Sequence, residues 1–378
     1  MLDLRRQYEQ IRDEMQTAVL GVLESQAFIL GPAVKDFERD AAVDLGVKHA
    51  IGCASGTDAL WLALAALEIG PGDAVVTTPF TFFATASCIT RVGATPVFVD
   101  IDPGTLNLSP ATVEGALAKH KNVKAVMPVH LYGQCADMDA FTKISADHKL
   151  AIVEDAAQAW GAKWNGRSAG GIGDIACFSF YPTKNLSAAG DAGMVTTNDD
   201  RLAERTTMLR AHGSRVRYYH DEIGWNSRLD SVQAAVLGVK LKHIAEWNRA
   251  RREKACRYHG LLQKAGLVQG NTTEVGAKAP IALLENRPEA QHVYHQYVIR
   301  AHRRDELRQH LAAQGVGTEI YYPVPLHLQK CFEYLGYAKG SLPESERASR
   351  EVLALPIFPE LTEEEQHYVV DAIAGFYS

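Results

Sequence analysis

The chain has 378 residues, of which 47% are hydrophobic and 22% are charged. These fractions are typical of a globular protein, so a disordered chain, a collagen-like repeat and a small disulfide scaffold are excluded. The length predicts a large core and allows two or three domains, or one large domain with an appendage. With 39 Lys plus Arg against 45 Asp plus Glu, the net charge of −6 lacks the basic excess of proteins that grip nucleic acid, so we expect no nucleic-acid partner.

The six cysteines are scattered along the chain, and no two of them form a CxxC pair. This pattern argues against zinc ribbons and redox motifs and is typical of a reducing compartment. Charged residues begin at Asp3, with no apolar signal-peptide core, and the most apolar helical stretch, Leu60–Leu67, is too short to cross a bilayer. We therefore expect a cytoplasmic protein with no membrane partner.

In chain order, apolar residues at helical spacing first predict a helix over residues 2–25. From Ser55 to about Asn198, short apolar runs alternate with helical patterns. The expected strands are 74–78, 95–100, 123–130, 151–154, 175–180 and 193–196, and the expected helices are 58–68, 83–92, 110–119 and 137–149. Strands that are apolar on both faces and alternate with helices indicate a mostly parallel sheet covered on both sides.

After Asn198 the alternation of strands and helices stops. The patterns predict helices over 200–211 and over about 229–265, with an irregular stretch at 270–295. The remaining expected elements are a strand at 296–300, a helix at 303–313, a strand at 318–322 and a helix at 362–376. We expect a large α/β domain over 1–240 and a smaller α+β domain over 241–378.

The first segment that could bind a ligand is Ser55-Gly56-Thr57, which joins a strand end to a helix start. Small and hydroxyl residues leave backbone N–H groups open at the positive end of the helix dipole, which favours a bound phosphate. A plain helix N-cap by Ser55 or Thr57 explains the same residues. This segment alone does not decide between the two.

The second segment is the pair Glu154-Asp155, directly after an expected strand. An acid at the carboxyl end of a parallel strand lies where ligands bind in open α/β sheets. A helix N-cap is the alternative. A metal site is not expected, because no histidine or acid pattern stands nearby.

The third segment holds Lys184, which lies 29 residues after Asp155 among apolar and small residues. Such surroundings desolvate an ammonium group and lower its pKa, and a lysine of this kind can form a Schiff base with a carbonyl. An exposed lysine near a turn is the alternative. Together the three segments supply what pyridoxal phosphate needs: a helix N-terminus for the phosphate, an acid for the ring nitrogen and an amine for the aldehyde.

At these residues the chain resembles the DegT–StrS family of nucleotide-sugar aminotransferases, which have the aspartate-aminotransferase fold. The resemblance covers nearly the whole chain. It implies fold type I of the pyridoxal-phosphate enzymes, with a mostly parallel seven-stranded sheet in a large α/β/α domain and a smaller C-terminal α+β domain. The segments that carry it are 28–32, 55–60, 79–85, 93–100, 130–133, 153–158, the run around Lys184, and 226–230.

The resemblance also implies roles around the cofactor, as pyridoxal phosphate or as its amine form, pyridoxamine phosphate. Lys184 matches the lysine that binds the cofactor covalently and moves a proton between substrate and cofactor. Asp155 matches the partner of the pyridine nitrogen, and Gln158 matches the residue bonded to the phenolic oxygen. Phe82 matches the aromatic that stacks on the ring, with Phe83 as the alternative one residue on; a plain core role remains open for Phe82.

Further matches concern the phosphate and the substrate. Phosphate ligands are implied at Gly56, Thr57 and Ser179. Asn226 and Arg228 match a segment that reaches the neighbouring subunit's site, which implies a homodimer with shared active sites, although Arg228 could instead cap a turn. Residues expected near the substrate are Tyr181, Tyr321, Tyr322 and His327. A loop histidine such as His327 is also compatible with a surface position.

Two segments depart from the family pattern. Ser187-Ala188-Ala189 stands where many relatives have a glycine and an aromatic or acidic residue, and Tyr321-Tyr322-Pro323 stands where many have His-Tyr-Pro. Both departures lie near the expected sugar, so they leave the substrate's identity open. Lys184 argues against the branch of this fold that has a histidine there and catalyses dehydration.

The resemblance thus implies transfer of an amino group from an amino acid, L-glutamate, to a keto-sugar nucleotide. The expected position is C3, on a dTDP-linked 3-keto-6-deoxyhexose or a UDP-linked 3-keto-N-acetylhexosamine uronate. C4 amination of the perosamine type is the alternative within the class. The alternatives outside it are a non-catalytic regulatory or DNA-binding protein, and another lysine-based enzyme such as a cysteine desulfurase or a small amino-acid aminotransferase.

Overall fold

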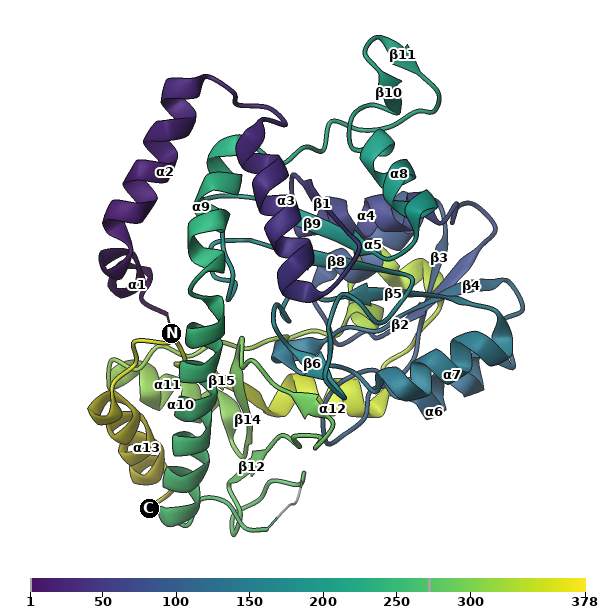
Figure 1. Cartoon of the computed structure of the whole chain (residues 1–378). Coiled ribbons are helices and arrows are strands. Elements are labelled where there is room, and N and C mark those ends of the chain that lie inside the picture. The colour runs from purple at the N-terminus through teal and green to yellow at the C-terminus, as the bar shows by residue number, and fades with distance from the viewer. Residues whose placement is uncertain (1, 271–272) are drawn as a thin grey trace.

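The computed structural model describes residues 2–270 and 273–378, and a seven-stranded sheet is its largest element (Figure 1). The strand order is β1-β9-β8-β5-β4-β2-β3. In chain order the strands are β1 (His49–Cys53), β2 (Ala74–Thr77), β3 (Thr95–Phe98), β4 (Val123–Met127), β5 (Ala151–Asp155), β8 (Ile175–Ser179) and β9 (Gly193–Thr197).

The sheet is mostly parallel. Strand β9 pairs antiparallel with β1 and β8, whereas β8, β5, β4, β2 and β3 are parallel to one another. The expected mostly parallel seven-stranded sheet is therefore confirmed. The strand β1 was implied only by the strand end before Ser55, and it closes one edge of the sheet beside β9.

Helices cover both faces of this sheet. One layer contains α4 (Gly56–Ala66), α5 (Phe83–Arg91) and α8 (Asp200–Leu209), and the other contains α3 (Pro32–Leu45), α6 (Pro110–Leu117), α7 (Met138–His148) and α9 (Ser231–Leu241). Successive strand residues face opposite layers: Val153 packs in the α4 core, whereas Ile152 packs in the α7 core. The strands therefore contain apolar residues on both faces, which is the pattern seen in the sequence.

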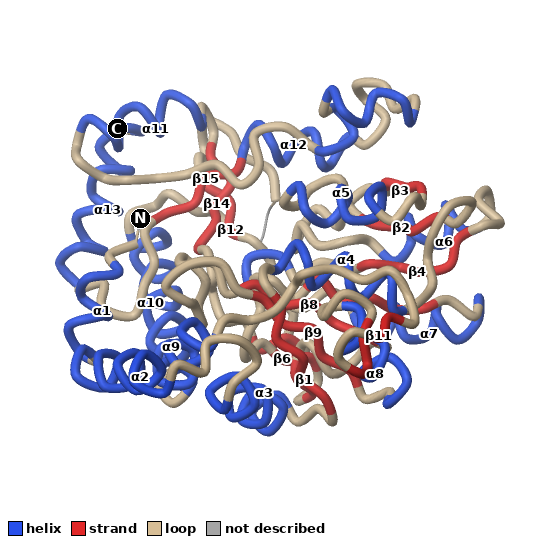
Figure 2. Tube along the Cα trace, turned by 90° about the horizontal axis from the view of Figure 1, so that it is seen from above, coloured by secondary structure: helices blue, strands red, loops and turns tan. Residues whose placement is uncertain are grey.

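A second core lies in the C-terminal part of the chain. Its sheet has the order β12-β14-β15 and is antiparallel, with β12 (Ile281–Leu283), β14 (Tyr297–Ala301) and β15 (Val352–Leu355). The helices around it are α10 (Ile244–Lys264), α11 (Arg304–Ala313), α12 (Pro343–Glu351) and α13 (Glu363–Tyr377). Figure 2 shows these strands as a group apart from β1, β8 and β9. The domain division at 240/241 stays a prediction.

The remaining elements are short or lie at the periphery. They are α1 (Leu4–Gln10), α2 (Arg12–Ser25), the three-stranded ribbon of β6 (Lys163–Trp164), β7 (Arg167–Ser168) and β13 (Ala290–Gln291), the hairpin of β10 (Ser214–Val216) and β11 (Tyr219–His220), and 3₁₀ turns η1 (Leu131–Gly133), η2 (Leu326–Leu328) and η3 (Lys330–Leu335). The β10–β11 hairpin projects from the body of the molecule (Figure 1). Across the described ranges, no helix combines the length and apolar character needed to cross a membrane.

Three expected elements differ from the structure. The helix expected at 2–25 is broken at Ile11, whose ψ of 18° is not helical. The helix expected at 229–265 is two helices, because α9 ends at Leu241 and α10 starts at Ile244. The first turn of α10 still packs in the large core through Ile244 and Trp247, and its later turns pack in the second core. The strand expected at 318–322 forms only an isolated bridge, Glu319 to Ala354, because the chain then turns away through a proline-containing loop.

The pairing of β1, β8 and β9 brings distant residues to one edge of the sheet. Gly193 of β9 is the partner of both Cys53 and Ser179, the last residues of β1 and β8. The backbone is tightly packed here, because a Cβ on Gly193 would lie 2.2 Å from the carbonyl oxygen of Ser55. The segment that starts α4 is thus held against the ends of two strands.

Replacing Gly193 by alanine should therefore destabilise the protein. Overpacking of this kind costs about 1–3 kcal/mol in the free energy of unfolding, because backbone must move to admit the methyl group. Gly260→Ala is the control: Gly260 lies in α10 with nothing within 4 Å of its added Cβ, and there alanine should stabilise by roughly 1 kcal/mol. Urea unfolding measures both. Equal effects at the two positions would contradict the packing described here.

Candidate active site

The expected phosphate segment lies at the N-terminus of α4. Ser55 is the N-cap, and its hydroxyl accepts a hydrogen bond from the Asp58 N–H at 3.1 Å. Within the described residues, the N–H groups of Gly56 and Thr57 and the Thr57 hydroxyl have no protein partner. Open N–H groups at the positive end of an 11-residue helix suit an anion. Both interpretations of this segment therefore apply, since the N-cap leaves donors free.

Ser179 lies against this segment. A Cβ on Gly56 would come within 2.5 Å of the Ser179 Cβ, so only glycine allows the end of β8 to approach the start of α4 this closely. The structure thus brings Gly56, Thr57 and Ser179 together, as their shared expected role requires.

Asp155 is the last residue of β5, and its side chain is buried. One carboxylate oxygen accepts from the Thr85 hydroxyl at 2.7 Å, and the other accepts from the Ala157 N–H at 3.2 Å. Burial raises the pKa of Asp155, while these two hydrogen bonds and the charge of Lys184 act in the opposite direction. A carboxylate can accept about four hydrogen bonds, so room for another donor remains.

Lys184 lies in the loop after β8, and its charge interacts with that of Asp155. Burial lowers the pKa of Lys184 to about 8, although the charge of Asp155 opposes this shift. Among the described residues, no side chain or carbonyl forms a hydrogen bond or ion pair with its amine. A desolvated amine without a partner is suited to attack a carbonyl.

Gln158 follows Asp155 by three residues and is fixed at both ends of its amide. The amide oxygen accepts from the Tyr132 N–H at 2.6 Å, and the amide nitrogen donates to the Tyr322 hydroxyl at 3.2 Å. An amide nitrogen has two hydrogens, so one donor is still available. The Phe82 ring lies 6.3 Å from the Tyr322 ring, whereas Phe83 packs against Phe332 at 5.7 Å. Of the two phenylalanines, Phe82 is therefore the one beside Tyr322, the residue to which Gln158 donates.

Other predicted residues lie at the margin of this group. The Tyr181 side chain is exposed, and its carbonyl accepts from the Lys184 N–H at 2.8 Å. The carbonyl of Tyr321 accepts a hydrogen bond from the Tyr132 hydroxyl. Asn226 is exposed, and the Arg228 Nε is buried with no hydrogen-bond partner.

His327 is buried in a different set of contacts. Its Nε2 lies 3.2 Å from a carboxylate oxygen of Glu346, and its ring lies 6.1 Å from that of Tyr337. It is therefore not the surface residue considered as an alternative. Its contacts include none of the other predicted site residues, so its expected role with the substrate stays a prediction.

Sequence reasoning did not single out the groups that surround the site. His295 lies close enough to Lys184 for their charges to interact, and burial lowers its pKa well below the usual value. Its Nδ1 lies 3.2 Å from the side-chain oxygen of Asn185, and the Asn185 amide donates to Asn248 at 2.8 Å. Asn248 lies 63 positions from Asn185 in the sequence, and His295 lies 110 positions from it. Only the adjacency of Asn185 to Lys184 could have signalled the network.

The carboxylate of Glu154, beside Asp155, is surrounded by hydrogen-bond donors of the protein. Its fully buried carboxylate accepts from the N–H groups of Gly170, Ile172 and Gly173 and lies 2.9 Å from Nε2 of His130. The Ala136 N–H donates to the other ring nitrogen, so Nε2 carries the hydrogen that faces Glu154. Burial favours the neutral acid, but these donors outweigh it and hold the pKa of Glu154 below its usual value.

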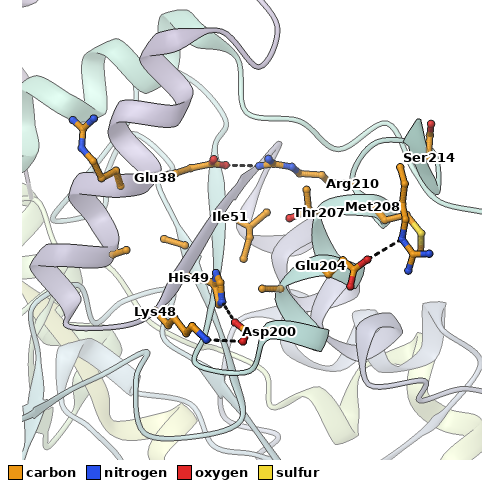
Figure 3. Close-up of a pocket in the computed structure, with 15 residues that line it drawn as sticks. Glu38, Lys48, His49, Ile51, Asp200, Glu204, Thr207, Met208, Arg210 and Ser214 are labelled. Carbon is orange, nitrogen blue, oxygen red and sulfur yellow. Dashed lines mark hydrogen bonds and ion pairs between the residues drawn. The ribbon is translucent and has the colours of Figure 1, made fainter. Parts of the chain in front are cut away.

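A separate cavity of about 690 Å³ lies between α3, α8 and the start of β1 (Figure 3). Its charged groups are largely paired: Asp200 lies 2.6 Å from His49 and 2.5 Å from Lys48, and Glu38 pairs with Arg210. None of the predicted site residues lines it. The described residues also hold no group of three or more His, Cys, Asp or Glu side chains placed to bind a metal ion.

With this geometry in place, the chain can be compared with known proteins. The sequence profile of the DegT/DnrJ/EryC1/StrS aminotransferase family matches residues 9–374. The chain belongs to this family. The resemblance and the fold expected from it are thereby confirmed, and so is an aminotransferase as the class of enzyme.

Curated relatives within the DegT family align along the whole chain. A "pleiotropic regulatory protein" of Geobacillus stearothermophilus is 52% identical over 378 residues, covering 100% of this chain and 98% of that protein. A UDP-N-acetyl-3-dehydro-α-D-glucosamine 3-aminotransferase of Acidithiobacillus ferrooxidans is 44% identical, covering 97% and 94%. A dTDP-3-amino-3,4,6-trideoxy-α-D-glucose transaminase of Streptomyces venezuelae is also 44% identical, covering 98% and 94%.

Solved structures agree with this assignment. DesV of S. venezuelae, solved in complex with a ketimine intermediate, matches with a TM-score of 0.93 at 43% identity, covering 100% of this chain and 97% of that one. NtdA of Bacillus subtilis, solved with bound pyridoxamine phosphate, matches with a TM-score of 0.87 at 31% identity, covering 97% and 82%. The expected cofactor, pyridoxal phosphate or its amine form, is confirmed at the level of the family.

The residues present fit such a cofactor. The site supplies one complementary group for each polar part of the cofactor. These groups are the free N–H groups at α4, the unpartnered amine of Lys184, the buried Asp155 carboxylate with spare acceptor sites and the spare amide hydrogen of Gln158. Each donor or acceptor is of the chemical type that the facing group requires.

The lowered pKa of Lys184 predicts how its reactivity depends on pH. Only the unprotonated amine attacks an aldehyde, so labelling of Lys184 by pyridoxal phosphate should rise with pH and level off above about pH 8. Borohydride trapping followed by peptide mass spectrometry measures this at the level of one residue. Nα-acetyl-lysine is the control, and its labelling should keep rising toward pH 10. A Lys184 profile identical to that of the control would contradict the burial described here.

The environment of Glu154 predicts a pH-dependent contribution to stability. A carboxyl group with a lowered folded-state pKa stabilises the fold above its ordinary pKa of 4.5, and that stabilisation is lost as the pH falls through the folded value. Glu154→Gln should lower the free energy of unfolding at pH 7 by about 1–3 kcal/mol, since an amide NH₂ would then face backbone donors. The difference from wild type should shrink at low pH.

Glu253→Gln provides the matched control for that experiment, because Glu253 is exposed on α10. Its effect at pH 7 should be within about 0.5 kcal/mol of zero. Urea unfolding at several pH values measures both variants. If Glu154→Gln were neutral at pH 7, the donors around Glu154 would not stabilise its charged form.

Proposed function

We propose that this protein is a pyridoxal-phosphate-dependent aminotransferase that moves an amino group from an amino acid, L-glutamate, to C3 of a keto-sugar nucleotide. The observation that carries the proposal is the unpaired, desolvated Lys184 amine beside the buried Asp155 carboxylate, at the sheet edge where α4 begins. The cofactor, when bound, supplies an aldehyde and a ring that accepts the electron pair left on carbon when a proton departs.

In this proposal each residue of the chain has a defined task. The Lys184 amine holds the cofactor and, once released, takes a proton from one carbon and returns it to another. The Asp155 carboxylate accepts a hydrogen bond from the ring nitrogen and keeps a proton on that atom. The spare amide hydrogen of Gln158 is donated to the phenolic oxygen, and the Phe82 ring covers one face of the cofactor.

The phosphate would be held by the N–H groups of Gly56 and Thr57 and by the hydroxyl groups of Thr57 and Ser179. Tyr181, Tyr321 and Tyr322 are the side chains proposed to face the substrate, and His327 is proposed as a further substrate residue. The support for these roles is the position of the tyrosines next to Lys184, Gln158 and Phe82. Burial raises the pKa of Tyr322, which favours its neutral hydroxyl as a hydrogen-bonding group.

We also propose a homodimer in which Asn226 and Arg228 of one subunit complete the other subunit's site. What supports it is the exposure of Asn226, the buried Arg228 Nε without a partner, and the presence of large exposed apolar side chains, namely Phe28, Ile29, Tyr218, Tyr219 and Ile223. A cytoplasmic location without membrane or nucleic-acid partners completes the proposal, supported by the net charge and by six free cysteines.

The position of amination is proposed from the relatives. Two relatives that are 44% identical carry names that place the amino group at C3, one on a UDP sugar and one on a dTDP sugar. The C4 alternative is therefore not favoured. The name of the relative that is 52% identical supports a regulatory role. That name does not account for a desolvated lysine beside a buried carboxylate.

The test follows the two halves of the reaction. Protein loaded with pyridoxal phosphate should change its visible spectrum when L-glutamate is added, and the resulting protein should then aminate a 3-keto sugar linked to UDP or dTDP, detected by mass spectrometry. Lys184→Ala should lower turnover at least about 100-fold. Lys143→Ala, an exposed lysine on α7, should leave it unchanged.

Each arm can fail on its own. If wild-type protein binds no cofactor, or if Lys184→Ala keeps full turnover, the catalytic assignment is wrong and the regulatory alternative takes its place. If glutamate produces no spectral change but another amino acid does, only the donor is wrong. If a 4-keto sugar is aminated and no 3-keto sugar is, only the position is wrong.

A further inference from the structure

Two buried hydroxyl groups form a chain that ends on Asp155. The Thr85 hydroxyl donates to Oδ2 of Asp155 at 2.7 Å, and the hydroxyl oxygens of Thr81 and Thr85 lie 2.9 Å apart. Both threonines are buried, with 3% of Thr81 and 0% of Thr85 exposed to solvent. A hydroxyl has a single hydrogen, so Thr85, which uses its hydrogen on Asp155, must accept from Thr81.

The chain of hydrogen bonds therefore has one direction, from Thr81 through Thr85 to the carboxylate. Hydrogen bonds in series polarise one another, and a donor aimed at a charged oxygen is stronger than one aimed at a neutral group. The Thr85 hydroxyl thus favours the carboxylate form of Asp155. After burial, which raises the pKa of Asp155, the Thr85 hydrogen bond is the largest opposing influence, followed by the Ala157 N–H and the charges of Lys184 and His130.

The same contacts fix the orientation of the carboxylate. Oδ2 is held by Thr85 from α5, and Oδ1 is held by the Ala157 N–H from the segment after β5. Two donors on different oxygens prevent rotation of the carboxylate plane. α5 packs against β2 and β3, whereas Asp155 lies on β5, so the chain of hydroxyl groups also connects two parts of the large core.

We infer that Thr85, supported by Thr81, is a positioning residue that holds the Asp155 carboxylate charged and in one orientation toward the ring nitrogen of the cofactor. This inference rests on the proposed function, because it takes Asp155 as the partner of that nitrogen. Thr85 acts through Asp155 and has no contact with substrate in this account. Removing the Thr85 hydroxyl should lower the affinity of the ring nitrogen for its proton and leave the phosphate segment at α4 intact.

The test compares four variants. Thr85→Val removes the donor at nearly constant volume, Thr85→Ser keeps it, and Thr81→Val removes only the support. Thr90→Val is the matched control, because Thr90 is an exposed threonine on the same helix. The protonation state of the ring nitrogen is measured by ¹⁵N NMR of ring-labelled pyridoxamine phosphate bound to each protein, and kcat is measured alongside.

We expect a protonated ring nitrogen in wild type, Thr85→Ser and Thr90→Val. In Thr85→Val the protonation equilibrium should shift toward the unprotonated ring by a factor of roughly 10 to 100. A shift of this size is typical for loss of a hydrogen bond to a charged group, and kcat should fall by a similar factor. Thr81→Val should show a smaller shift in the same direction. A purely structural effect would lower the unfolding temperature and leave the ¹⁵N shift unchanged.

The outcomes separate this inference from the proposed function. If wild type holds a protonated ring and Thr85→Val holds it equally, with unchanged kcat, the inference is overturned and the proposed function stands. If the ring is unprotonated in wild type, Asp155 does not keep a proton on it and the inference fails, whereas cofactor binding and turnover decide the proposed function separately. Should Thr85→Val not fold, Thr81→Val decides, and an unchanged ¹⁵N shift and kcat in that variant overturns the inference.

Discussion

The site depends on one electrostatic relation inside the large core: an acidic and a basic side chain are both desolvated near each other without forming an ion pair. Asp155 is buried at the end of β5, and Lys184 is buried in the loop after the neighbouring strand β8. Burial raises the pKa of Asp155 and lowers the pKa of Lys184, which favours the neutral form of each. The charge of each group opposes the shift in the other. A desolvated amine and carboxylate that stay unpaired are available to a third molecule.

The parallel sheet explains why these groups meet. Parallel strands end at one edge, so β5, β8 and the loop after β1 deliver their last residues to the same place. Close backbone packing then fixes the distances, since neither Gly56 nor Gly193 leaves room for a side chain. The donors around the Glu154 carboxylate secure the end of β5 from the opposite side. The packed scaffold thus holds the Lys184 amine and the Asp155 carboxylate in place, although burying each of them costs free energy.

Local chemistry made much of this site predictable. Ser55-Gly56-Thr57, Asp155 and Lys184 lie at the end of a strand or in the loop that follows one, and their residue types together match the polar groups of one cofactor. The same reasoning predicted the strands of the large sheet other than β1, because buried parallel strands are apolar on both faces. The family resemblance supplied the expected roles of Gln158 and Phe82, and the proposed role of Asn226 and Arg228 toward a partner subunit, which no local pattern indicates.

What could not be predicted depends on contacts between distant segments. Thr85 donates to a residue 70 positions away, and His295 meets Asn185 across 110 positions, so neither has a signal in its own neighbourhood. The break between α9 and α10 has no signal in the sequence, whose helical periodicity continues through it, and α10 passes from the large core at Ile244 to the second core at Ala255. Residues 318–322 have the composition of a strand, but a proline-containing loop follows and leaves only one bridge.

The central claim is that Lys184 and Asp155 face opposite ends of one bound cofactor. The most direct measurement is a crystal structure of the protein grown with pyridoxal phosphate. The account predicts continuous electron density from Nζ of Lys184 to the cofactor, the ring nitrogen within hydrogen-bond distance of the Asp155 carboxylate and the phosphate at the N-terminus of α4. Cofactor density attached to another lysine, or a ring nitrogen turned away from Asp155, would contradict it.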